Sequence, residues 1–249
     1  RDVLGSRGLG DVYKRQVETV VKALLFDLDG TLLDSVDDLT VAINNTLLSR
    51  SLPTVNRSDV ALFIGKGARV LVQRALTKAC GCEPEEKLID EILPRYLQEM
   101  KLAEGTRTKQ IPTVPDALTR LQRAGFKMAI VTNKPANVAR KLVTQFNLLD
   151  FFETVIGAGD VDTIKPDPKM LIEAAHRIGI KITDCLMIGD SMNDSIAAKN
   201  AQIHALLVKT GYNEGIAIDQ WAKEHAPNDI VFDTMAQLAD YLIKNERRN

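Results

Sequence analysis

Two aspartates, Asp27 and Asp29, stand two positions apart at the end of an apolar segment. That segment, from residue 20 to 26, has the composition typical of a buried parallel strand. Open α/β sheets place their chemistry at the carboxyl ends of strands, and residues two apart on a strand point to the same side. A single aspartate here would most simply form a turn or cap a helix. Two of them, followed at once by Gly30 and Thr31, indicate a functional site instead.

Three more short polar segments follow predicted strands later in the chain. They are Thr132-Asn133, Lys165-Pro166 and the segment 189–194, which contains Asp190 and Asp194. Each has an ordinary explanation when it is taken alone: a helix cap, a solvated loop charge, or a Gly-Asp turn. Because they occur in order after alternating strands, we predict that they form one site with the first pair.

The elements that must position these residues can be located from hydrophobic periodicity. Strands are predicted at 127–131, 154–156, 185–188 and 204–208, with helices at 115–124, 135–146, 168–178 and 193–201. This alternation predicts an α/β fold, a Rossmann-like three-layer core with a parallel sheet. Only helical patterns, at 36–47, 58–63, 68–79 and 85–101, lie between the first strand and the others. We therefore expect an α/β core formed by 17–34 and 113–249, with a helical cap of 35–112 inserted.

The composition limits the possible partners and compartments. The chain has 249 residues, 45% of them hydrophobic and 26% charged, with a net charge of −1. We expect no nucleic-acid and no membrane partner, since there is no basic block and no run near the ~18 apolar residues of a membrane span. Three cysteines, an odd and sparse set, imply no disulfide framework. A cytoplasmic enzyme, monomeric or homodimeric, fits these observations.

The segment 6–16 reads like one translation frame of an adapter used in sequencing libraries. We therefore expect residues 1–16 to be an artefactual or disordered tail, and they carry no weight in the fold prediction.

The four polar segments together resemble the motifs of the haloacid-dehalogenase superfamily. These motifs are Asp-x-Asp-Gly-Thr at 27–31, the strand-end Thr132, Lys165, and Gly-Asp-x-x-x-Asp at 189–194. The resemblance covers the chain after the tail, and a helical cap after the first motif belongs to the same pattern. Dehalogenases and phosphonatases of the superfamily lack the second aspartate of the first motif. Asp29 therefore indicates phosphoryl transfer.

The resemblance implies a Mg²⁺-dependent phosphatase. Asp27 would be the nucleophile that forms an aspartyl-phosphate, and Asp29 would act as general acid and then as general base. Asp27, the backbone carbonyl of Asp29 and Asp190 would hold Mg²⁺, which offsets the repulsion between the carboxylates and the phosphate.

The remaining motif residues would bind the phosphoryl group or orient the site. Thr132 would donate a hydrogen bond to a phosphoryl oxygen, and the backbone amides from Asn133 onward would add an anion site. Lys165 would supply positive charge opposite the metal. Asp194 would act indirectly, by orienting a water ligand or Lys165.

Two further segments, 63–76 in the cap and 210–219 in the core, resemble those of bacterial phosphoglycolate phosphatases. This implies a small phosphomonoester substrate, 2-phosphoglycolate, hydrolysed to glycolate and phosphate. Its carboxylate calls for cap cations, for which we expect Lys66 and Arg74, although either could be only a solvated charge. One departure is Gln202, at a position where such proteins often end a helix with glycine. A phosphosugar mutase of the same fold, a phosphatase for another small organophosphate and an inactive binding protein remain alternatives.

Overall fold

The computed structural model describes residues 21–246, so the expected tail at 1–16 lies outside the described part of the chain. Within that part, a six-stranded sheet has the order β5-β4-β1-β6-β7-β8, and all neighbouring strands are parallel. The strands are β1 (Ala23–Phe26), β4 (Lys127–Pro135), β5 (Thr154–Ala158), β6 (Cys185–Gly189), β7 (Ala205–Val208) and β8 (Ile230–Phe232). The predicted parallel α/β fold is confirmed.

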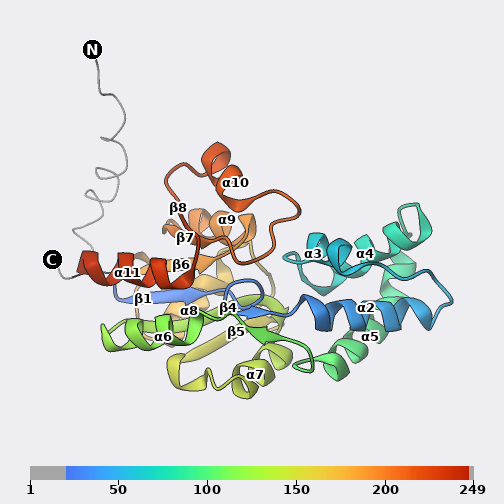
Figure 1. The fold of residues 1–249 in the computed structure, drawn as a ribbon, viewed down its shortest axis with the longest axis horizontal. Coiled ribbons are helices and arrows are strands. Elements are labelled where there is room, and N and C mark those ends of the chain that lie inside the picture. The colour runs from blue at the N-terminus through green and yellow to red at the C-terminus, as the bar shows by residue number, and fades with distance from the viewer. Residues whose placement is uncertain (1–20, 247–249) are drawn as a thin grey trace, which may run out of the picture.

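Helices cover both faces of the sheet, which gives the three layers seen in Figure 1. One face packs against α6 (Val114–Arg123), α7 (Ala136–Gln145) and α11 (Met235–Glu246), and the other against α8 (Lys169–Arg177), α9 (Met192–Asn200) and α10 (Ile218–His225). Short 3-10 helices span Leu149–Phe151 and Ile182–Asp184. Alternation along β1 sends Leu24 and Phe26 into one hydrophobic cluster and Leu25 into the other. Neither face of the central strand is therefore exposed to solvent.

The cap helices lie beside the sheet, at the right of Figure 1. They are α2 (Val36–Leu48), α3 (Arg57–Phe63), α4 (Gly67–Cys80) and α5 (Glu86–Ala103). Their apolar sides pack on one another in a hydrophobic cluster that is distinct from the two clusters of the sheet. Val138 of α7 is its one buried member from outside residues 36–103. The helices fall within the predicted cap, while its limits at 35 and 112 stay a prediction.

The chain enters and leaves the cap helices at neighbouring points. The short strands β2 (Leu33–Asp34) and β3 (Lys109–Gln110) pair antiparallel, with Leu33 opposite Gln110. Just beyond them, the buried carboxylate of Asp38 accepts five hydrogen bonds from residues 105–108. One side chain at the start of α2 thus satisfies the donors of the returning segment.

Most predicted boundaries differ from the structure by one or two residues, the end of β4 differs by more, and some elements were not predicted. Strand β4 continues to Pro135 and does not stop at residue 131, and α7 begins at Ala136. The elements without a prediction include β2, β3, the edge strand β8, and α11, which packs on one face of the sheet. No helix among the described residues is long and apolar enough to cross a membrane.

Candidate active site

Strand register brings the predicted site residues to one edge of the sheet. Phe26, the last residue of β1, lies opposite Ile130 of β4 and Ile188 of β6. Asp27 follows Phe26 directly, and its backbone N–H donates to the Ile188 carbonyl at 2.8 Å. Thr132 comes two residues after Ile130, and Asp190 comes two residues after Ile188. Segments more than 100 residues apart in sequence therefore meet because their strands are adjacent and parallel.

Lys165 is buried between two carboxylates. Its ammonium nitrogen lies 2.9 Å from Asp27 Oδ1 and 2.7 Å from Asp194 Oδ1, and it donates to the Val131 carbonyl at 2.7 Å. Burial opposes the charged form, but the carboxylates of Asp194 and Asp27 outweigh it and raise the pKa of Lys165. The ammonium thus donates hydrogen bonds to Asp194 and Val131 and forms an ion pair with Asp27.

Asp190 is fixed by donors from two other segments. Thr31 donates to its Oδ1 at 2.6 Å, and the Tyr212 backbone N–H donates to Oδ2 at 2.7 Å. Glycine is required beside it: a Cβ at Gly211 would lie 1.9 Å from Asp190 Oδ2, and one at Gly30 would lie 2.4 Å away. The carboxylate is therefore held against backbone, with little freedom to change position.

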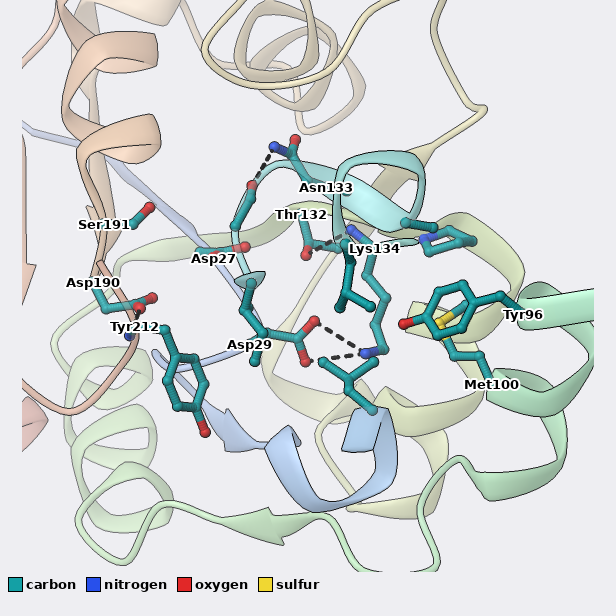
Figure 2. Close-up of a pocket in the computed structure, with 17 residues that line it drawn as sticks. Asp27, Asp29, Tyr96, Met100, Thr132, Asn133, Lys134, Asp190, Ser191 and Tyr212 are labelled. Carbon is teal, nitrogen blue, oxygen red and sulfur yellow. Dashed lines mark hydrogen bonds and ion pairs between the residues drawn. The ribbon is translucent and has the colours of Figure 1, made fainter. Parts of the chain in front are cut away.

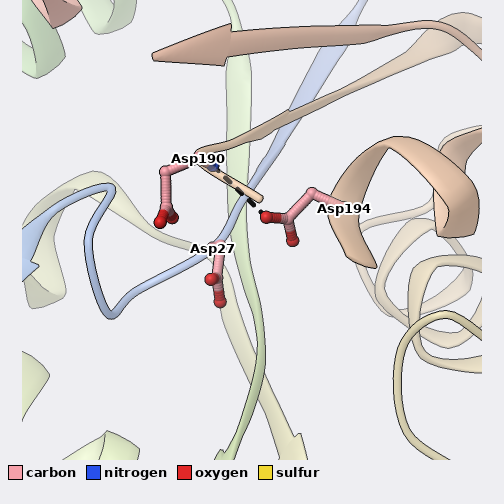
Figure 3. A group of neighbouring side chains, drawn as sticks. All are labelled: Asp27, Asp190 and Asp194. Atoms are coloured by element: carbon pink, nitrogen blue, oxygen red, sulfur yellow. Dashed lines mark hydrogen bonds between the residues drawn. The ribbon is translucent and has the colours of Figure 1, made fainter. Parts of the chain in front are cut away.

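Asp27, Asp190 and Asp194 converge at the sheet edge (Figure 3), and a carboxylate oxygen from each lies within 4.8 Å of the others. Burial raises the pKa of Asp27 to about 6 although Lys165 lowers it. Burial, and then the carboxylates of Asp27 and Asp194, raise the pKa of Asp190 well above its usual range. Three acidic groups around one lysine leave an excess of negative charge, and an all-oxygen donor set suits a hard divalent cation such as Mg²⁺.

Asp194 is already bonded through both of its oxygens. Oδ1 contacts Lys165, and Oδ2 accepts from the Ser191 hydroxyl at 2.7 Å and from the backbone N–H groups of Ser191 and Asp190 at 3.1 and 3.3 Å. Asp194 accepts four hydrogen bonds and Asp190 only two, so Asp27 and Asp190 have more oxygen lone pairs left for a cation than Asp194 has.

Asp29 has a cation of its own, which the sequence analysis did not identify. The Lys134 ammonium lies 3.0 Å from Asp29 Oδ2 and 3.2 Å from Oδ1, and Figure 2 shows the lysine side chain reaching across the pocket to this carboxylate. The Ser35 hydroxyl also donates to Asp29 Oδ1. Ser35 occupies the N-cap position of α2 but makes no side-chain cap, so its hydroxyl serves the site and not the helix.

Thr132 and Asn133, in the second half of β4, have different roles. The buried Thr132 hydroxyl accepts a 3.3 Å hydrogen bond from the Lys134 backbone N–H, which leaves its own proton available. The Asn133 side-chain amide donates to the carbonyls of Gly65 and Lys165 and accepts from the Lys165 N–H, all at 2.8–2.9 Å. Asn133 therefore links the cap loop, β4 and the Lys165 loop, and its amide is not free for a ligand.

A pocket with about 540 Å³ of empty space, part of it open to solvent, lies between this edge of the sheet and the cap helices. Its polar lining includes Asp27, Asp29, Thr132, Lys134 and Asp190, and the cap side adds apolar groups from Leu39, Ile64, Leu71, Tyr96 and Met100. Figure 2 shows Tyr96 and Met100 of α5 on the side of the pocket nearest Lys134. The space suits a small ligand that reaches both the carboxylates and Lys134.

Lys66 and Arg74, expected to bind the substrate, are paired with a core residue. The carboxylate of Glu214 lies 2.9 Å from Lys66 Nζ and 2.7 Å from an Arg74 guanidinium nitrogen. Although burial opposes it, the two cations hold the pKa of Glu214 below its ordinary value. Neither cation lines the pocket. A role for them in carboxylate binding stays a prediction, and it requires Glu214 to be displaced.

Glu104, at the end of α5, is a second feature that the sequence analysis missed. It is 4% exposed, and neither of its carboxylate oxygens has a hydrogen-bond partner within residues 21–246. Burial raises its pKa to about 7, Lys134 lowers it and Asp29 raises it again. Nothing in the local sequence distinguishes this glutamate from the exposed ones of the same helix.

Comparison with known proteins places this site in a family. The family model for haloacid dehalogenase-like hydrolases matches residues 24–208. A phosphoglycolate phosphatase of Psychrobacter arcticus is 36% identical over 224 residues, which cover 89% of this chain and 95% of that protein. One of Vibrio vulnificus is 36% identical over 227 residues, covering 90% and 96%. A crystal structure of a predicted phosphoglycolate phosphatase from Haemophilus somnus superposes with a TM-score of 0.79 at 30% identity, covering 88% of this chain and 97% of that one.

The structure combines a parallel α/β sheet, two aspartates directly after its central strand, and a group of helices inserted after them in the sequence. This combination is typical of a class of hydrolytic enzymes. The chain belongs to the haloacid dehalogenase-like hydrolase family, as its sequence motifs indicated.

Proposed function

We propose that this chain, a phosphatase of its family, hydrolyses 2-phosphoglycolate to glycolate and phosphate through an aspartyl-phosphate on Asp27. The observation that carries the chemistry is the convergence of Asp27, Asp190 and Lys165 at the carboxyl end of β1, next to Asp29. The substrate follows from relatives named phosphoglycolate phosphatase that match nearly the full length of the chain.

In the first step, an Asp27 oxygen attacks phosphorus and the bond from phosphorus to the glycolate oxygen breaks. Asp29 in its protonated form gives its proton to that oxygen, so that glycolate leaves as a neutral hydroxyl. Thr132 donates to a phosphoryl oxygen, and Lys165 offsets the charge on Asp27 and on the phosphate.

In the second step, the oxygen of a water molecule attacks the phosphorus of the aspartyl-phosphate. Asp29 removes a proton from this water during the attack. The bond between phosphorus and Asp27 breaks. Phosphate is released, and the free Asp27 carboxylate is regenerated. Asp29 ends this step protonated, ready for the next substrate. Asp27, Asp190 and the backbone carbonyl of Asp29 would hold Mg²⁺, which would neutralise phosphoryl charge and align the phosphate with its attacker.

The proposal is tested by phosphate release in the presence of Mg²⁺ from 2-phosphoglycolate, p-nitrophenyl phosphate and glucose 6-phosphate. Wild-type enzyme should prefer 2-phosphoglycolate, and Asp27→Asn should lower kcat by at least about 10⁴-fold. The exposed Asp150 gives a matched control, Asp150→Asn, which should be as active as wild type. Asp29→Asn should still form a covalent phosphoryl-enzyme from p-nitrophenyl phosphate, because that leaving group needs no acid.

Two results would contradict the proposal. Near wild-type turnover by Asp27→Asn would remove the covalent mechanism. A preference for hexose phosphates, or isomerisation of a hexose phosphate that depends on a sugar bisphosphate, would replace the substrate assignment and leave the phosphoryl chemistry in place.

A further inference from the structure

The proposed substrate poses a recognition problem that the pocket must solve. In 2-phosphoglycolate the carboxylate is joined to the ester oxygen through a single methylene group. The group that protonates the ester oxygen and the group that binds the carboxylate must therefore be close neighbours. Asp29 is proposed to protonate the ester oxygen, so the cation that binds the carboxylate should lie next to Asp29.

The other cations near the site do not meet this condition. Lys165 already directs its ammonium to Asp27, Asp194 and the Val131 carbonyl. Lys66 and Arg74 share Glu214 and do not line the pocket. Using them would require breaking their ion pairs and moving their charges.

Lys134 meets the condition. It is the one cation among the described residues that line the pocket, and its side chain is 4% exposed. Within residues 21–246, the hydrogen bonds of its ammonium go only to the two oxygens of Asp29, so one of its three donors is free. Apolar side chains of Leu39, Leu71 and Met100 line the same pocket, which strengthens any charge interaction there.

We propose that Lys134 binds the substrate carboxylate and is the residue that selects for it; this rests on the proposed function. The incoming carboxylate takes the lysine from Asp29. A ligand without a carboxylate leaves Lys134 on Asp29.

The test compares 2-phosphoglycolate with ethyl phosphate, which has the same two-carbon ester with a methyl group in place of the carboxylate. Lys134→Met removes the charge and keeps an unbranched side chain. The control is Lys141→Met, at an exposed position of α7. We expect Lys134→Met to lower kcat/KM for 2-phosphoglycolate by at least about 30-fold, the loss typical for a desolvated charged partner. The loss on ethyl phosphate should be much smaller, so that the ratio of the two kcat/KM values falls by at least about tenfold, and the control should retain both activities.

A binding measurement separates recognition from chemistry. In an Asp27→Asn background, which does not turn over, addition of Lys134→Met should weaken the Kd for 2-phosphoglycolate by a similar factor in calorimetry and leave the Kd for ethyl phosphate unchanged. Circular dichroism and thermal melts show whether each variant is folded, and Lys134→Gln supplies a second neutral variant if the methionine variant is not.

Equal losses on both substrates would overturn the proposal, because Lys134 would then serve only Asp29 or the fold. Unchanged selectivity in both neutral variants would overturn it as well. If the wild-type enzyme itself shows no preference for 2-phosphoglycolate over ethyl phosphate, the proposed function fails and carboxylate selection by Lys134 fails with it. A wild-type preference that survives loss of the lysine refutes the role of Lys134 alone.

Discussion

Replacing Glu104 by glutamine should change how the stability of the protein depends on pH. The folded chain buries this carboxyl group without a hydrogen-bond partner among the described residues, and its pKa rises from 4.5 to about 7. The folded state therefore binds this proton more tightly than the unfolded state does. The stability from this group is fully present below about pH 4.5 and is lost as the pH rises through about 7.

The size of the effect follows from the two pKa values. At 1.36 kcal/mol for each pKa unit, the difference between 4.5 and about 7 corresponds to about 3 kcal/mol in the free energy of unfolding. About 2.5 kcal/mol of this falls between pH 5 and pH 8. Glutamine has the same shape and no charge, so Glu104→Gln removes this pH dependence. Any constant cost of burying the amide shifts the whole curve and leaves its slope unaffected.

The assay is urea unfolding followed by circular dichroism at pH 5, 6, 7 and 8. The quantity of interest is the free energy of unfolding of Glu104→Gln minus that of wild type, which should increase by about 2.5 kcal/mol across this range. Glu224→Gln, at an exposed position of α10, is the matched control and should give a flat difference. A flat difference for Glu104→Gln too, or one that falls with pH, would show that Glu104 is paired or solvated in solution and would refute the reasoning.

Three further outcomes can be checked on the same protein. Asp38→Ala should lower the free energy of unfolding by about 2–4 kcal/mol in urea titrations, because it leaves buried donors unpaired. Asp37→Ala breaks only an exposed pair with Arg57 and should lower it by less than about 1 kcal/mol. Equal losses in the two variants would contradict this. Gln202 has a φ of +59° just after α9, so Gln202→Gly should raise stability by about 1 kcal/mol, and a thermal melt that shows a loss would disprove it. Chelation of divalent cations should abolish phosphate release, and added Mg²⁺ should restore it. Ca²⁺ should inhibit, because its coordination shell is larger and looser. Full activity in the presence of chelator would exclude a metal requirement.

Local sequence signals were sufficient for most of the fold. The buried run before Asp27 and the regular alternation after residue 113 led to a parallel α/β sheet, which the structure has. The missed helix α11 also carries a signal, since Met235, Leu238, Ala239 and Leu242 are spaced as on one helical face. Strand β8 has only three residues, too few for a periodic pattern.

The polar contacts of the site could not be predicted in the same way. Lys134 precedes a proline at the end of a strand, and nothing nearby in sequence indicates that Asp29, 105 positions earlier, is its partner. Lys66 and Arg74 looked free because Glu214 lies 140 or more positions away from them. Sequence shows which charges exist, whereas their pairing depends on how the cap helices and the core lie together.

The path of the chain through β2 and β3 also has a consequence for how such enzymes can diversify. Because the two short strands are paired, the segment between them begins and ends at adjacent points, and a tight turn could span the same gap. The contact that holds its ends, from Asp38 to residues 105–108, lies wholly inside that segment. An insertion, exchange or loss of the cap helices therefore leaves the strand register that assembles Asp27, Thr132 and Asp190 unaltered. The apolar side of the pocket can therefore change in one part of the gene, while the residues of phosphoryl chemistry and Lys134 are kept in the other.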